Sequence, residues 1–147
     1  MNRLRTGPAR RWAAAAVVVS TALLAGCASG PYPVEGTVVW ADDGTPAKEL
    51  ENSQVVFEQP ETNTTARGVI QGDATFRMTT LNPDDGAMPG EHKVLIAESQ
   101  KSANKDGTQL MPPILDQKYR STATTDLTVT VAPGKNAATL KLHRIKK

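Results

Sequence analysis

The sequence predicts an all-β protein: a single antiparallel seven-stranded β-sandwich, preceded by a helical signal peptide. Apolar and polar residues alternate in several short runs, such as 34–40 and 127–131, and a period of two is typical of strands with one buried face. Turn-forming residues, such as Asp43-Gly44, separate these runs at short intervals. Beyond residue 33 no run repeats its apolar residues every 3.6 positions, so we expect little or no helix there.

The first 26 residues have the charge and hydropathy pattern of an export signal. Four arginines and no acidic residue occupy positions 1–11, and an apolar stretch of about 14 residues follows at 12–25. Such a stretch is shorter than the ~20 residues that span a bilayer as a helix, and it matches the apolar core of a secretory signal. The signal ends at Leu24-Ala25-Gly26-Cys27, which resembles the lipoprotein signal box (aliphatic, small, small, Cys).

Cys27, the only cysteine in the chain, is the predicted lipidation site. The signal box implies cleavage before Cys27, diacylglycerol on its sulfur and acylation of the new amino group, so that a lipid bilayer is its partner. Two acyl chains are enough for stable anchoring. The alternative is an ordinary cleaved signal beside an unrelated cysteine. Neither Ala28 nor Ser29 is the aspartate that retains some lipoproteins at an inner membrane, which favours the outer membrane of a two-membrane cell envelope.

Removal of the signal changes the charge and defines the domain organisation. The whole chain has 17 basic and 15 acidic residues; cleavage before Cys27 removes four of the basic ones and leaves a net charge of −2. This balance argues against a nucleic-acid surface, which needs clustered cations. We therefore divide the chain into a signal peptide (1–26), a lipid anchor with its tether (27–33) and one β-sandwich domain (34–147).

Seven strands are expected, each bounded by turn formers: 34–40, 53–58, 65–70, 74–80, 92–98, 127–131 and 138–142. Runs 65–70 and 74–80 should form a hairpin around Gln71-Gly72-Asp73. Alternation within its strand places His92 on a buried face. Residues 109–120 contain two adjacent prolines, which remove backbone donors, so this segment is expected to be an extended crossover.

The order of these motifs resembles that of the carboxypeptidase regulatory-like, or transthyretin-like, domain. The motifs are VEGTV at 34–38, DGTP at 43–46, DATF at 73–76 and DGAMPGEHKV at 85–94. The resemblance implies a transthyretin (prealbumin)-like sandwich, of a kind that bacterial lipoproteins carry mostly without an assigned activity. Ala74 departs from the family pattern, which has glycine after the aspartate, and it leaves the turn less freedom at positive φ.

His92 and His143, the only histidines, are the first candidates for a metal or catalytic site. Zinc needs three or four ligands; with no close histidine pair, we expect His92 to pack in the core and His143 to face solvent. Asp42-Asp43-Gly44 and Asp84-Asp85-Gly86 contain the oxygens that calcium prefers, but Asp-Gly is also a plain turn signal, and we expect turns at both. The sequence contains no nucleophile elbow or other ordered catalytic motif.

We therefore predict a non-catalytic structural or interaction module of the cell envelope, not an enzyme, with no cofactor and no metal site. Its partner would be an envelope protein or a polysaccharide, met by the sheet edges and by the polar loops 82–90 and 99–120. The alternative is a lipoprotein that binds a small ligand, a carbohydrate or a metal. Sugar sites usually expose aromatic rings, and the candidates are Tyr32, Trp40 and Tyr119. Exposed Trp40 near Tyr119 favours this alternative, whereas burial of both argues against it.

Overall fold

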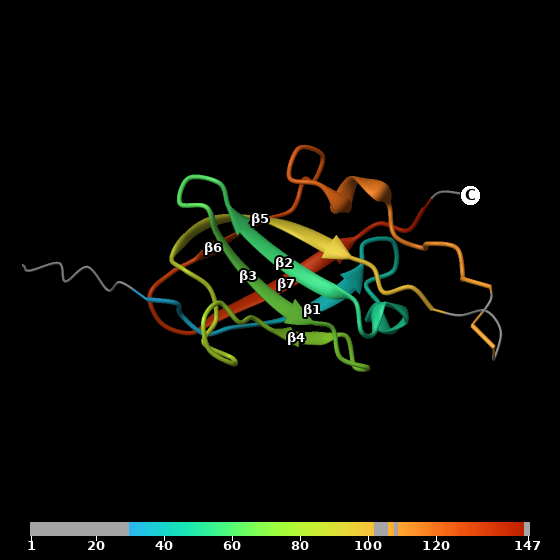
Figure 1. Cartoon of the computed structure of the whole chain (residues 1–147), viewed down its shortest axis with the longest axis horizontal. Coiled ribbons are helices and arrows are strands. Elements are labelled where there is room, and N and C mark those ends of the chain that lie inside the picture. Colours follow the sequence, from blue (N-terminus) through green and yellow to red (C-terminus); the bar gives the residue numbers. More distant parts are fainter. Residues whose placement is uncertain (1–29, 102–105, 108, 146–147) are drawn as a thin grey trace, which may run out of the picture.

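In the computed structural model, which describes residues 30–101, 106–107 and 109–145, seven strands form two stacked sheets (Figure 1). The strands are β1 (Val34–Trp40), β2 (Gln54–Gln59), β3 (Thr64–Val69), β4 (Thr75–Arg77), β5 (Gly90–Ala97), β6 (Thr128–Val131) and β7 (Asn136–Leu142). One sheet has the order β4-β1-β7 and the other β3-β2-β5-β6. The helical elements of the described residues are two short 3-10 turns, η1 (Lys48–Leu50) and η2 (Gln117–Arg120). The prediction of an all-β sandwich with seven strands is confirmed.

Alternation along the strands builds the core between the two sheets. In β1 the buried side chains are Val34, Val38 and Trp40, which lie on one face because successive strand residues point to opposite sides. Across the gap, Phe57 of β2 and Phe76 of β4 meet edge to face, with their ring centroids 6.4 Å apart. Aromatic pairs prefer this geometry. The two sheets are therefore joined by a well-packed apolar layer.

The prediction of a purely antiparallel sandwich is wrong for one pair of strands. β7 runs parallel to β1, in a register from Val34 opposite Asn136 to Trp40 opposite Leu142. The cause is the connection: β6 and β7 are joined by the short turn 132–135 but belong to different sheets. β7 crosses to the other sheet before it pairs, and it reaches β1 running in the same direction. The other strand pairs are antiparallel.

The predicted hairpin of the third and fourth strands is also wrong. β3 belongs to the four-stranded sheet and β4 to the three-stranded one, and an isolated bridge between Arg67 and Thr79 connects the two. β4 pairs instead with β1, where Phe76 lies opposite Gly36. A Cβ atom at Gly36 would overlap the Phe76 ring, so the glycine leaves the space that this ring fills. Burial of Phe76 beside β1 therefore accounts for the crossing.

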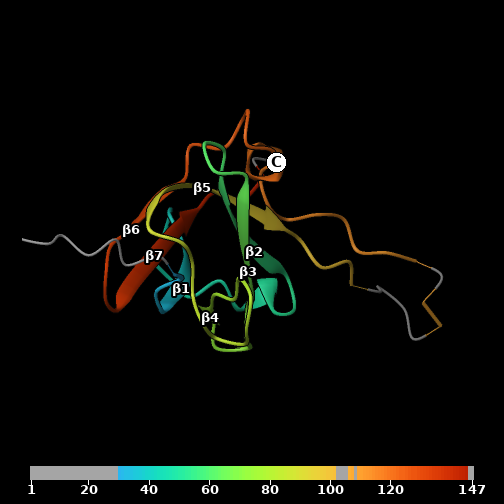
Figure 2. The same cartoon turned by 60° about the vertical axis from the view of Figure 1, so that its left-hand side comes forward.

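The two ends of the sandwich differ in what extends from them. Residues 30–33 lie at one end, and the described residues between β5 and η2 extend from the opposite end (Figure 1, Figure 2). Among the described residues, no helix has the length and apolar character needed to cross a bilayer. The predicted signal peptide (1–26) and Cys27 lie outside the described residues.

Candidate functional site

His92 is packed in the core, as predicted. Its side chain is 1% exposed, and the centroid of its ring lies 5.7 Å from that of Phe57. Nε2 lies 2.7 Å from the carbonyl oxygen of Met88; because a carbonyl only accepts, Nε2 carries the proton and donates. Nδ1 has no hydrogen-bond partner in the described part of the chain. His143, by contrast, is exposed directly after β7.

Asp85 holds its loop together through backbone hydrogen bonds. Its two carboxylate oxygens accept from the N–H groups of residues 80, 81 and 82 at 2.7 to 3.0 Å. Burial raises the pKa of Asp85, but these N–H groups lower it by more, so the pKa lies below the ordinary value of 3.8. The Asp84-Asp85-Gly86 sequence is therefore a turn, and the Asp85 carboxylate oxygens already have donors.

The second acidic loop is a turn as well. Asp43 accepts from the hydroxyl and the backbone N–H of Thr45 at 2.6 and 2.9 Å, and these bonds lower the pKa of Asp43. Asp42 pairs with Arg144 at 2.6 Å. Within residues 30–101, 106–107 and 109–145, no three His, Cys, Asp or Glu side chains are grouped so that they could hold a metal ion.

Trp40 and Tyr119 form no exposed aromatic platform, because both side chains are 0% exposed. Trp40 Nε1 donates to Glu49 at 3.1 Å, and the guanidinium of Arg144 lies 4.2 Å from the centre of its ring. The Tyr119 hydroxyl accepts the backbone N–H of His143 at 3.1 Å. The condition that favoured a sugar-binding site, an exposed Trp40 near Tyr119, is therefore not met.

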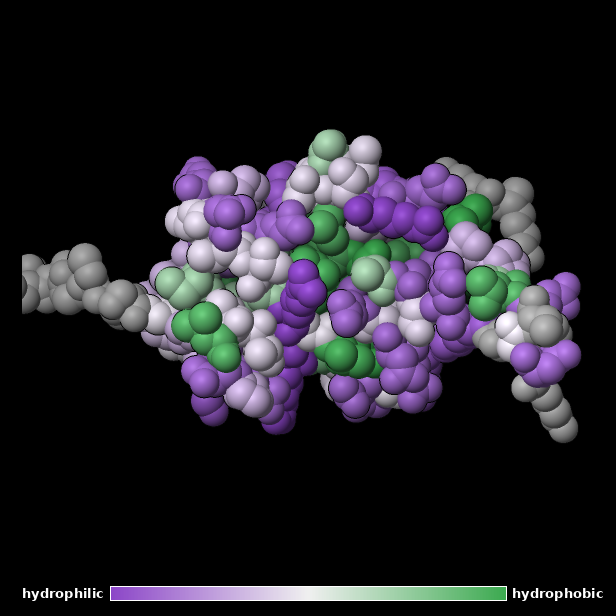
Figure 3. All heavy atoms as spheres, viewed as in Figure 1, coloured by the Kyte–Doolittle hydropathy of each residue, from purple (hydrophilic) through white to green (hydrophobic). Residues whose placement is uncertain are grey.

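Two grooves with volumes of about 670 and 660 Å³ adjoin, the first on the outer face of the four-stranded sheet and the second at the side where β3 lies beside β4. Strand register places Arg67, Val56 and Leu95 side by side across β3, β2 and β5. Arg67 and Gln54 line both grooves. Figure 3 shows apolar surface in the middle of this face, between strongly hydrophilic patches. The first groove therefore has an apolar centre, formed by Val56 and Leu95, within a largely polar lining.

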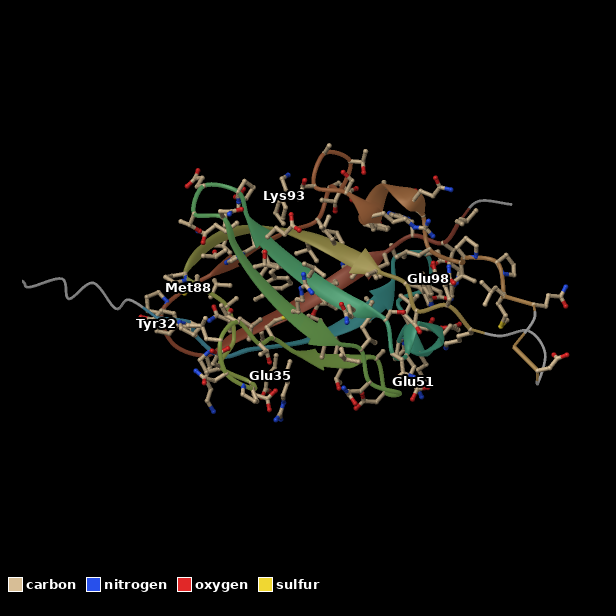
Figure 4. The ribbon with its side chains drawn as sticks, in the orientation of Figure 1. Tyr32, Glu35, Glu51, Met88, Lys93 and Glu98 are labelled. Atoms are coloured by element: carbon tan, nitrogen blue, oxygen red, sulfur yellow. The ribbon has the colours of Figure 1, made fainter. Side chains whose placement is uncertain are left out.

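Residues 98–100, Met111 and Pro113, which lie between β5 and η2, form part of the rim of the first groove. Glu98, at the end of β5 (Figure 4), accepts from the N–H groups of Ile114 at 2.9 Å and Leu115 at 3.4 Å. Its carboxylate also lies 3.8 Å from the guanidinium of Arg120. These contacts hold the crossover over the end of the sheet, where Met111, 52% exposed, lines the groove. The surface combines apolar contact area with two guanidinium groups, which is suited to recognition.

The N-terminal tether is clamped to the domain. Tyr32 and Ala87 exchange two backbone hydrogen bonds of 2.8 and 3.0 Å, and the Pro33 carbonyl accepts the backbone N–H of Asn136 at 2.9 Å. Gly86, at φ 97°, permits this contact, because a Cβ atom there would overlap the carbonyl oxygen of Tyr32. Figure 4 shows Tyr32 at the end of the sandwich opposite Glu98. These bonds fix the point at which the chain leaves the domain.

Sequence reasoning missed the groove. Its floor consists of outward-facing residues of β2, β3 and β5, which come together only through the strand register. The sequence signal that could have indicated the groove lies at Val56 and Leu95. Both are apolar residues at positions where alternation predicts a solvent-facing side chain.

Comparison of this chain with protein-family models, with curated proteins and with solved structures found no match. The resemblance to the carboxypeptidase regulatory-like domain therefore stays a prediction that rests on the sequence motifs.

Proposed function

We propose that this protein is a lipid-anchored lipoprotein of the cell envelope, and that its sandwich is a non-catalytic interaction module with a transthyretin-like fold. Cys27 would carry the acyl chains, with the outer membrane favoured as their location. The recognition surface would be the groove over β3, β2 and β5, with its apolar centre and the guanidinium groups of Arg67 and Arg120.

The clamped tether is the observation that carries this proposal. Four residues separate Cys27 from Tyr32, whose backbone is bound to Ala87. An extended chain covers at most about 3.6 Å per residue, so these two residues lie no more than about 18 Å apart. A lipid on Cys27 would keep the module close to the bilayer and present its surfaces within a short range of heights.

An envelope protein is the partner that the groove fits best. Val56 and Leu95 supply aliphatic contact area and the rim holds arginines and carboxylates, whereas Trp40 and Tyr119, two of the three aromatic candidates for a sugar site, are buried. The second candidate function is small-ligand binding in this groove, because its volume lies in the range of about 300–1,000 Å³ typical of ligand pockets.

The intact mass of the protein purified from native membranes tests the anchor. We expect a chain that begins at Cys27 and carries the added mass of two or three acyl groups. A Cys27→Ser variant should leave the membrane fraction. An unacylated chain that begins elsewhere contradicts the anchor, and with it the location in the envelope.

Cross-linking in native membranes tests the interaction module. Leu95→Asp places a charge on the groove floor, and Thr128→Asp is the matched control on the outer face of β6, away from the groove. We expect a cross-linked partner that Leu95→Asp removes and Thr128→Asp retains. Equal cross-linking in both variants contradicts the groove as the recognition surface.

A further inference from the structure

The outer edge of β7 is an unpaired strand edge. Among the described strands β7 pairs with β1 alone, and at the two ends of that ladder the Asn136 N–H and the Leu142 carbonyl bond to the β1 chain. Because the direction of hydrogen bonding alternates along a strand, Ala137, Thr139 and Lys141 direct their backbone groups away from β1. Within the described part of the chain, none of these N–H and C=O groups has a partner.

Other segments limit this open edge to residues 137–141. Just past it, the Asp116 N–H donates to the His143 carbonyl at 3.2 Å, so the crossover already lies beside the continuation of β7. At the other end, the Asn136 side chain bonds both the N–H and the carbonyl of Ala132 at 2.9 Å and closes the turn. At ~3.3 Å per residue, this open edge of residues 137–141 is about 13 Å long; we call the space beside it the slot.

A strand in this slot would cover partly buried apolar residues. β6 lies on the same side of the sandwich, in the opposite sheet (Figure 2). Leu127, directly before β6, and Val129 within it pack against the core and are only partly buried. Inward-pointing side chains of an added strand would pack against them, because alternate residues share a face. The slot therefore selects an extended segment with apolar residues at every second position.

The outward face of the slot has one cation. Lys141 is exposed, and its ammonium forms no ion pair among the described residues. An acidic residue beside it on an added strand would make a cross-strand pair, which contributes about 0.2–1 kcal/mol in sheets. Alternating apolar residues and one acidic residue thus define the chemistry of the occupant.

We propose that the β7 edge accepts an extended peptide segment of another envelope protein, about five residues long, which adds to the three-stranded sheet as a fourth strand. The backbone groups of Ala137, Thr139 and Lys141 would supply the hydrogen bonds, as in other cases of strand addition. This inference rests on the proposed function, because it names a partner class and a second contact site for the same interaction module.

A second copy of the chain fits the slot less well. β7 is seven residues long, and the open edge spans residues 137–141. Antiparallel pairing of two β7 strands would bring the 132–135 turn of one copy against Asp116 of the other, where the crossover already lies. A segment without such a turn avoids this collision.

Amide hydrogen exchange on the mature full-length chain in detergent micelles tests the proposal. The probe is a synthetic peptide, capped at both ends, with the sequence TVTVD, which places both valines on one face and the aspartate on the other. We expect it to slow exchange at Ala137, Thr139 and Lys141 at least tenfold and to leave Thr128 and Thr130 of β6 unchanged. Unchanged exchange at the β7 edge with millimolar peptide, or protection of β6 instead, overturns the proposal.

Among the described strands β6 pairs with β5 alone, so it also has an unpaired edge, and two proline variants separate the edge of β7 from that of β6. Thr139→Pro removes an outward N–H that has no partner in the fold, so an edge strand should tolerate it; we expect it to weaken peptide binding at least tenfold. Thr130→Pro makes the same change on β6, and we expect wild-type affinity. Equal peptide affinities of the two variants overturn the assignment to β7. If sedimentation shows that the wild-type protein is a dimer and that Thr139→Pro is a monomer, the occupant is a second copy of the chain and not a strand of another protein.

The Cys27→Ser variant keeps this test separate from that of the lipid anchor. Peptide binding by this variant should equal that of the acylated protein, because the slot lies on the folded domain. If the mass measurement showed no acyl group while the peptide still protected β7, the anchor would fail and the strand-accepting edge would stand. If the protein were acylated but the peptide did not protect β7, the anchor would stand and the strand-accepting edge would fail.

Discussion

The two lateral sides of the sandwich both end in edge strands, but only one side is closed. On the side of β3 and β4, Arg67 and Thr79 exchange two backbone hydrogen bonds of 2.8 Å, so the chain leaving one sheet seals the edge of the other. On the side of β6 and β7, residues 137–141 retain their outward backbone groups without a partner in the described chain. The backbone groups at the sheet edges are therefore paired on one side of the sandwich and unpaired on the other.

Closure of the side of β3 and β4 depends on a small residue that lets one backbone approach another. At Gly68 of β3, an added Cβ atom would overlap the carbonyl oxygen of Arg77, so the seal needs glycine there. The open side has a single edge lysine, Lys141, as protection against indiscriminate pairing. A module that accepts a strand needs an accessible edge with few residues that hinder pairing.

The largest effect is expected from breaking the closed side. Gly68→Ala forces a methyl group against the Arg77 carbonyl, and we expect a loss of about 3 kcal/mol in the free energy of unfolding, as in other overpacked sites. Chemical denaturation measures it. Gly72→Ala is the matched control, since its Cβ would meet only the flexible side chain of Glu51 at 3.1 Å. A control that is as unstable as Gly68→Ala would refute the close-approach explanation.

The next effect comes from the carboxylate that holds the loop after Thr79. Asp85→Asn removes the charge from three hydrogen bonds to backbone N–H groups, and we expect a loss of about 1–2 kcal/mol at pH 7. Because the pKa of Asp85 is lowered from 3.8, its contribution is present above pH 3.8 and disappears as the pH falls through the lowered value. Wild type and variant should therefore converge as the pH falls below 3.8. A constant difference across this range contradicts the electrostatic origin.

A smaller effect is expected where the crossover contacts His143, directly after β7. Tyr119→Phe removes the acceptor of the His143 N–H, a bond of 3.1 Å, and keeps the buried ring. We expect a cost of about 1 kcal/mol and unchanged exchange at Thr139. Faster unfolding of the whole sandwich, with loss of several kcal/mol, would show instead that the hydroxyl holds the crossover in place.

The smallest effect is expected at the turn between β3 and β4. Ala74 has φ 67° and is buried. Ala74→Gly relieves the left-handed strain of about 1 kcal/mol but removes a buried methyl group worth about 0.8 kcal/mol. The free energy of unfolding should therefore change by less than about 0.5 kcal/mol. A gain above about 1.5 kcal/mol would show that the strain dominates.

The strands and the core residues were largely predictable from the sequence, because each depends on local alternation. Phe57, His92 and Leu140 are buried as the period of two predicts. Strand partners were less predictable, since pairing depends on contacts between residues far apart in the chain. The space left by Gly36 for the Phe76 ring draws β4 onto β1, and no local signal distinguishes that glycine from one in a turn.

The candidate site was predictable only in part. The turns at Asp43 and Asp85 follow from Asp-Gly dipeptides, and the structure confirms both. The open edge could not be predicted, because it requires knowing that β7 is an edge strand and that the crossover at Asp116 covers only its continuation. Lipidation of Cys27 stays a prediction, since that residue lies outside the described part of the chain.

Amide hydrogen exchange on the free, full-length mature protein tests the contrast between the two sides most directly. Arg67, whose N–H donates to Thr79, and Thr139, whose N–H has no partner in the described chain, are both exposed strand residues. We expect the Arg67 amide to exchange orders of magnitude more slowly than that of Thr139, near the rate of global opening. Equal protection of the two amides would mean that the β7 edge is already covered, which contradicts an open side of the sandwich.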